Sequence, residues 1–160
     1  MFTTESEKQF ILKFLSKTHR LLEYGSGAST ELLSGYVKEV ISVEHNFDWY
    51  TSVKNKNISN VKIIYAPPDL NYIEGNHDGT YEQFKTYINV PKDYGKFDVV
   101  FIDGRARIEC VKFCKNILND NALIFVHDFH HRYESENYKK MLDYCEIVDY
   151  ENQMVLLKIK

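Results

Sequence analysis

The sequence has few cysteines, no long apolar runs and little net charge, and each shortage excludes a class of protein. Its three cysteines, Cys110, Cys114 and Cys145, are an odd number, and the spacing of the first two suits a helix. We therefore expect reduced core residues rather than a disulfide framework or a zinc knuckle. No apolar run approaches the roughly 20 residues that cross a bilayer, and the first residues lack a signal-peptide pattern. We expect a cytoplasmic protein.

The charge of the chain is nearly balanced. It carries a net charge of −3 over 160 residues, and its lysines and arginines are scattered. This distribution offers no basic surface for a nucleic-acid backbone or for an anionic membrane. We therefore expect a small-molecule substrate and neither of those partners. The length and the 44% hydrophobic content suit one compact domain over residues 1–160, and they leave open whether it forms a homo-oligomer.

Short apolar segments alternate with helical patterns along the chain. Strands are predicted at residues 20–24, 37–44, 61–65, 97–103, 122–126, 146–150 and 153–159. Helices are predicted at 5–17, from Ser29 or Thr30 to Gly35, and at 47–56, 105–118 and 134–145. The alternation predicts an α/β fold with a Rossmann-like, doubly wound, mostly parallel seven-stranded sheet. The closing hairpin adds an antiparallel C-terminal strand, which we expect at an edge of the sheet.

Residues 69–96 interrupt this alternation. The segment reads as a long loop with a short helix near 80–88, and it contains several aromatic residues, among them Tyr72, Phe84 and Tyr87. Such residues either form a wall or lid that stacks on a sugar, or pack against the sheet. Packing is the commoner role of aromatic residues at this spacing, and we expect it here.

A turn through two glycines follows the first predicted strand. Gly25 and Gly27 lead into a helix, and Glu44 ends the next strand nineteen residues after Gly25. This arrangement is typical of an adenine-nucleotide cofactor site in which the acid binds a ribose hydroxyl. A dinucleotide site would have a third glycine where Thr30 stands. The charge of Glu23 suits a ligand that carries an ammonium and a sulfonium better than a pyrophosphate. Both departures favour S-adenosylmethionine over NAD.

Three sequence motifs carry a family resemblance. E-Y-G-S-G-x-S-T at 23–30, S-V-E-H at 42–45 and F-D-V-V-F-I-D-G-R at 97–105 resemble class I S-adenosylmethionine-dependent methyltransferases. V-H-D-F at 126–129, together with D-G-R, is similar to small members of this class, some of which modify sugars. The resemblance implies that Glu23, Gly25 and Gly27 hold the methionine part, Glu44 the ribose and Asp69 the adenine. The implied cofactor site is Glu23, Gly25, Gly27, Ser29, Thr30, Glu44, His45 and Asp69.

Three polar residues end two neighbouring strands. Asp103 ends the fourth predicted strand, and His127 and Asp128 come at the end of the fifth, so they should converge beside the transferred methyl group. In one hypothesis His127 or Asp128 is the general base for a hydroxyl acceptor. In a second, Asp103 and Asp128, with His127, hold a divalent metal ion that lowers the pKa of the acceptor oxygen. In a third, the two acids only cap helices or bind loop amides.

Two further residues are candidates for substrate binding. Arg105 suits a carboxylate or phosphate of the substrate, or else pairs with a nearby acid. His130 extends the histidine and aspartate cluster, although a solvated side chain is the simpler expectation.

These patterns predict an S-adenosylmethionine-dependent methyltransferase that modifies a hydroxyl of a small molecule, such as a sugar or glycan precursor. Two alternatives stay open. The first is a module of the same fold that binds the cofactor or a partner chain without catalysis. The second, less favoured, is an NAD-dependent oxidoreductase.

Overall fold

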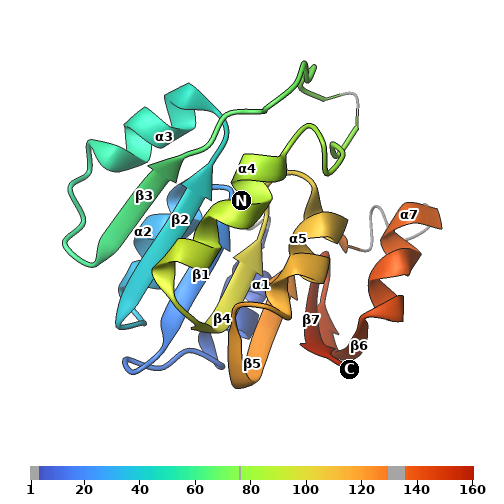
Figure 1. Cartoon of the computed structure of the whole chain (residues 1–160). Coiled ribbons are helices and arrows are strands. Elements are labelled where there is room, and N and C mark those ends of the chain that lie inside the picture. The colour runs from blue at the N-terminus through green and yellow to red at the C-terminus, as the bar shows by residue number, and fades with distance from the viewer. Residues whose placement is uncertain (1–3, 76, 130–135) are drawn as a thin grey trace.

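A seven-stranded sheet forms the centre of the computed structural model, which describes residues 4–75, 77–129 and 136–160. The strand order is β3-β2-β1-β4-β5-β7-β6 (Figure 1). The strands are β1 Arg20–Tyr24, β2 Glu39–Glu44, β3 Val61–Tyr65, β4 Phe97–Ile102, β5 Leu118–Val126, β6 Cys145–Glu151 and β7 Met154–Ile159. Strands β1 to β5 are parallel, and β7 is antiparallel to both β5 and β6. The predicted fold class is confirmed.

The position of the antiparallel strand differs from the expectation. Strand β7 lies inside the sheet between β5 and β6, so the prediction that it would form an edge is wrong. The reason is burial: residues 154–157 of β7 are all buried, whereas residues 146–150 of β6 are exposed. The apolar strand therefore takes the interior position, and the more polar strand takes the edge.

Helices cover both faces of the sheet (Figure 1). They are α1 Glu5–Leu12, α2 Ala28–Ser34, α3 Phe47–Lys54, α4 Lys85–Asn89, η1 Val90–Tyr94, α5 Arg107–Cys114, α7 Glu136–Lys139 and η2 Lys140–Asp143. Side chains alternate along each strand, so β1 feeds two cores. Leu22 and Tyr24 pack on the side of α4 and α5, and Leu21 packs on the side of α1 and α2. Glu23 shares the second face and therefore points toward α2.

The core of the protein tests several predictions made from the sequence. Phe84 and Tyr87 are completely buried, which confirms the packing role of these two aromatic residues. Cys110, Cys114 and Cys145 are free thiols in the interior, as expected. The helix expected at 105–118 is shorter, because β5 already begins at Leu118. In the part of the chain that the structure describes, no helix is long and apolar enough to cross a membrane.

Candidate functional site

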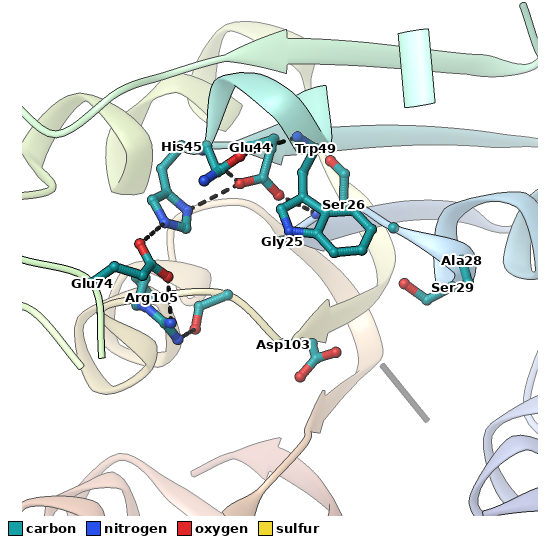
Figure 2. A pocket seen from close by; sticks show the side chains of 13 residues that line it. Gly25, Ser26, Ala28, Ser29, Glu44, His45, Trp49, Glu74, Asp103 and Arg105 are labelled. Atoms are coloured by element: carbon teal, nitrogen blue, oxygen red, sulfur yellow. Dashed lines mark hydrogen bonds and ion pairs between the residues drawn. The ribbon is translucent and has the colours of Figure 1, made fainter. Parts of the chain in front are cut away.

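A cleft opens at the carboxyl ends of β1, β2 and β4, where the strand order reverses between β1 and β4 (Figure 2). Ligands of open α/β sheets bind at this position. The lining comes from the ends of β1, β2 and β4, from the start of α2, from α3 and from the loop after β3. It consists of Gly25, Ser26, Gly27, Ala28, Ser29, Glu44, His45, Asn46, Trp49, Glu74, Asp103, Gly104 and Arg105.

The two glycines of the turn have different roles. Gly25 has a φ of +96°, and a Cβ there would lie 2.7 Å from both Cα and N of Gly104. No side chain fits, because the loops that follow β1 and β4 are in contact at this point. A Cβ on Gly27 would meet only the ring of Trp49, at 3.7 Å. Gly25 is thus required by the fold, whereas Gly27 keeps the floor of the cleft open.

Glu23 lies beneath the glycine turn and has no exposed surface. Its carboxylate accepts hydrogen bonds from the hydroxyls of Ser29, Thr30 and Ser42, each at 2.6 Å. Burial raises the pKa of Glu23 to about 6, although the three hydroxyls act in the opposite direction. The Thr30 hydroxyl also accepts a hydrogen bond from the Gly27 amide, at 3.0 Å. Glu23 therefore acts on the shape of the turn, and Ser29 lies between it and the cleft.

Glu44 is the acid that reaches the cleft from β2. One carboxylate oxygen accepts from the amide of Ser26 at 2.6 Å, and the other accepts from the amide of Asn46 at 2.7 Å. These bonds tie the end of β2 to the glycine turn. The sequence pattern missed Trp49, the single tryptophan of the chain, five residues further on. Its half-exposed indole lies over the turn in Figure 2.

A chain of charges joins three loops at one end of the cleft (Figure 2). His45 Nδ1 lies 3.0 Å from Glu44 Oε1, and its Nε2 lies 3.2 Å from Glu74 Oε2. Arg105 donates to the other oxygen of Glu74 at 2.6 Å. Burial alone would lower the pKa of His45, but the two carboxylates outweigh it and raise that pKa above its usual value. The structure thus shows Arg105 paired with a nearby acid.

Asp69 takes no part in this lining among the described residues. Its exposed carboxylate accepts from the amide and the hydroxyl of Thr86, at 2.8 and 2.6 Å, and the hydroxyl bond lowers the pKa of Asp69. Glu74, five residues later in the same loop, lines the cleft instead. The pattern missed Glu74 because nothing in a long loop marks which acid the chain will turn inward.

The three residues at the ends of β4 and β5 do converge. Asp103 lines the cleft, and its Oδ1 lies 3.2 Å from His127 Nδ1. Asp128 Oδ1 lies 3.3 Å from the same nitrogen. His127 itself is 1% exposed, and its other nitrogen faces Glu7 Oε2 at 3.3 Å. Each nitrogen of this imidazole therefore faces a carboxylate oxygen. His130 lies outside the described residues.

Arg107 is a buried member of this cluster that the sequence pattern missed. Its buried guanidinium lies 3.2 Å from Asp128 Oδ2 and 3.6 Å from Asp103 Oδ1, and it donates to the carbonyls of Gly104 and His127. Asp78 accepts from the Arg107 amide at 2.8 Å and lies 3.7 Å from its guanidinium. The D-G-R motif ends at Arg105, so it gave no signal for Arg107, which lies four residues after Asp103.

The position of Arg107 argues against a metal ion in the same cluster. Ligand atoms of Asp103, His127 and Asp128 lie within 4.8 Å of one another, a spacing that suits a cation. The guanidinium of Arg107 already supplies positive charge to both carboxylates and would repel a second cation. The carboxylates of Asp103 and Asp128 therefore suit the arginine that balances them better than a metal ion.

Comparisons with known proteins agree with this architecture. No family model and no curated protein sequence matches the chain. Among solved structures, a methyltransferase-like protein from Silicibacter pomeroyi has a TM-score of 0.77 at 19% identity and covers 100% of this chain and 88% of its own. An rRNA methylase from Streptococcus thermophilus has a TM-score of 0.62 at 11% identity and covers 99% of each chain.

The chain has the class I methyltransferase fold. A precorrin-8w decarboxylase from Methanobacterium thermoautotrophicum shares this methyltransferase fold at a TM-score of 0.63 and 13% identity, and it covers 98% of this chain and 90% of its own. The structural neighbours thus include a decarboxylase and an rRNA methylase. At these identities the likeness shows the fold, and the acceptor has to be argued from the site.

Proposed function

We propose that this protein transfers a methyl group from S-adenosylmethionine to a hydroxyl of a small molecule, such as a sugar or glycan precursor. One observation carries the proposal. A single cleft has the glycine turn and Glu44 on one side and Asp103 on the other. A site for the cofactor and a carboxylate able to take a proton therefore lie next to each other.

The lining residues fit this cofactor. The acids Glu44, Glu74 and Asp103 outnumber the basic His45 and Arg105, which favours a ligand with a positive charge. Glu44 would accept from the ribose hydroxyls. The carboxylate of Glu74 suits the exocyclic amine of adenine, so we assign it the role that the sequence pattern gave to Asp69. When bound, the cofactor supplies an electrophilic methyl group on a sulfonium.

A hydroxyl acceptor needs a group that takes its proton, and we assign this role to Asp103. The residue lines the cleft, whereas His127 is buried behind it with carboxylates at both nitrogens. Arg107, close to Asp103 and Asp128, stabilises the two acids as anions. Aligning the acceptor with the methyl group and removing its proton are the two tasks that a methyltransferase performs.

The proposal of a small acceptor rests on the charge pattern of the chain. With a net charge of −3 and scattered basic residues, the sequence has no stripe of lysine and arginine that follows a phosphate backbone. An RNA acceptor is the natural competitor, since one neighbour is named as an rRNA methylase.

Calorimetry with S-adenosylhomocysteine and with NAD tests the cofactor. We expect S-adenosylhomocysteine to bind and NAD to give no signal. Glu44→Gln should weaken the binding about tenfold, the loss of one charge-assisted hydrogen bond. The matched control is Glu31→Gln, which removes an exposed acid of α2 outside the cleft. Binding of NAD alone would overturn the proposal and favour an oxidoreductase.

A panel of hydroxyl sugars and a short RNA tests the acceptor, with labelled S-adenosylmethionine as donor. We expect transfer to a sugar, and loss of at least a hundredfold in rate in Asp103→Asn, which lacks the base, with cofactor binding retained. Transfer to the RNA alone would disprove the small acceptor. Binding of cofactor with no transfer to any acceptor would favour the non-catalytic module.

A further inference from the structure

We propose that Glu7, in the first helix of the chain, positions Asp103 through His127. The inference rests on the proposed function, because it assumes that Asp103 takes the proton of the acceptor. Glu7 lies 120 residues from His127 in sequence, and it has no exposed surface. Its Oε2 lies 3.3 Å from Nε2 of His127, and Nδ1 of that ring lies 3.2 Å from Oδ1 of Asp103. A buried line of three residues thus runs from α1 to the cleft.

The backbone contacts of Glu7 use both oxygens of its carboxylate. The residue belongs to the capping box of α1, in which Thr4 and Glu7 bind each other's backbone amides, and its other oxygen accepts from the amide of Gln153 at 3.0 Å. A glutamine has one acceptor oxygen and would satisfy only one of these two amides. Beside the amides, Nε2 of His127 faces the Glu7 carboxylate. The same acid therefore ties α1 to the end of β5.

The side chains around His127 fix the orientation of its ring. Glu7 faces the ring from α1, Asp103 from the end of β4 and Asp128 from the end of β5, while Arg107 of α5 contacts the two aspartates. Because a carboxylate faces each nitrogen, the ring is held in one orientation. The contact between Nδ1 and Oδ1 in turn fixes the Asp103 carboxylate at the wall of the cleft. Glu7 is therefore a positioning residue, because it has its effect through the ring.

The first experiment needs no acceptor. Nitrogen-15 NMR of the whole protein at pH 7 reports which nitrogens of His127 carry a proton. We expect Nε2, the nitrogen that faces Glu7, to carry a proton in the wild type, and the signal of this proton to shift in Glu7→Gln. The matched control is Glu5→Gln, which removes an exposed acid of the same helix and should leave the ring unchanged. A wild-type ring without a proton on Nε2 would overturn the inference, and this measurement does not depend on how the variant folds.

The second experiment measures catalysis. In Glu7→Gln we expect kcat to fall about tenfold, while KM for S-adenosylmethionine and the affinity for S-adenosylhomocysteine stay within twofold. The double variant Glu7→Gln with His127→Gln should be no slower than His127→Gln alone, because the two residues act in series. Additive losses would show that Glu7 acts independently of His127 and would overturn the inference.

The two experiments separate this inference from the proposed function. If the wild type fails to bind S-adenosylhomocysteine, the proposed function falls, and the NMR result still decides whether Glu7 controls the ring. If the cofactor binds and methyl transfer occurs, but Glu7→Gln matches the wild type in both experiments, only the role of Glu7 is refuted.

Discussion

The two sides of the cleft are built in different ways. On the proposed cofactor side, the turn, its buried acid, Glu44 and Trp49 all fall within residues 23–49, and backbone geometry shapes the site. On the proposed acceptor side, the contributing residues come from four separate parts of the chain, and ionic contacts hold them together. They are Glu7, Asp78, Asp103, Arg107, His127 and Asp128.

This difference predicts different weaknesses. An added side-chain atom should destabilise the cofactor side most, because its strand-end loops are in contact at Gly25 and Gly104. Removal of one charge should destabilise the acceptor side most, because the remaining buried charges then lose their compensation. Four substitutions test that contrast, in order of decreasing effect on the free energy of unfolding.

Arg107→Met should produce the largest loss. It keeps much of the side-chain volume but leaves Asp103 and Asp128 without their guanidinium, and the carbonyls of Gly104 and His127 without their donor. Removing one partner of a buried charge cluster costs about 3–5 kcal/mol, which urea denaturation measures. The control Arg105→Met breaks a pair with the exposed Glu74 and should cost about 1 kcal/mol or less. Equal losses in the two variants would contradict the contrast.

Gly25→Ala should cause the second largest loss in the free energy of unfolding. The substitution forces an alanine to a positive φ and brings its Cβ to 2.7 Å from the Gly104 backbone. The strain and the overlap together should cost about 3 kcal/mol in the free energy of unfolding. Gly27→Ala, whose Cβ would meet only the Trp49 ring at 3.7 Å, should cost about 1 kcal/mol or less. Similar stabilities for the two variants would disprove the distinct role of Gly25.

Glu23→Gln should change how stability depends on pH. Because burial raises the pKa of Glu23 from 4.5 to about 6, the folded protein keeps a proton that the unfolded chain has lost between these values. This stabilisation is complete below pH 4.5 and disappears as the pH rises through 6, a change of about 2 kcal/mol. The variant lacks this titration. Its unfolding free energy relative to the wild type should therefore rise by that amount between pH 4 and 7, and a difference independent of pH would refute the shift.

Glu74→Gln should have the smallest effect. It weakens an exposed link from the loop after β3 to His45 and Arg105, so stability should change by less than about 1 kcal/mol. The link to His45 is complete below the ordinary histidine pKa and weakens as the pH rises through the raised pKa of His45. Amide exchange in residues 69–75 should be faster than in the wild type at pH 6, and the difference should narrow at pH 9. Glu82→Gln, in the same loop, is the control.

Patterns over a few residues predicted most of the fold. The bounds of β1 and β3 match the predictions at 20–24 and 61–65, because short apolar runs that end at turn residues are typical of strands in a buried parallel sheet. The end of α5 and the start of β5 were missed, since Leu118, Asn119 and Asp120 have no apolar periodicity. The order of β6 and β7 also escaped the pattern, because it depends on which strand is buried on both faces.

For the site, the sequence by itself determined the glycine turn, Glu44 and the acids that end β4 and β5. These residues follow strands, and parallel strands bring their carboxyl ends to one edge of the sheet. Only the tertiary structure decided that Glu74 rather than Asp69 lines the cleft, that Arg107 balances Asp103 and Asp128, and that Glu7 faces His127. Contacts between residues 120 positions apart leave no periodic signal, because they arise from packing of separate elements and not from local geometry.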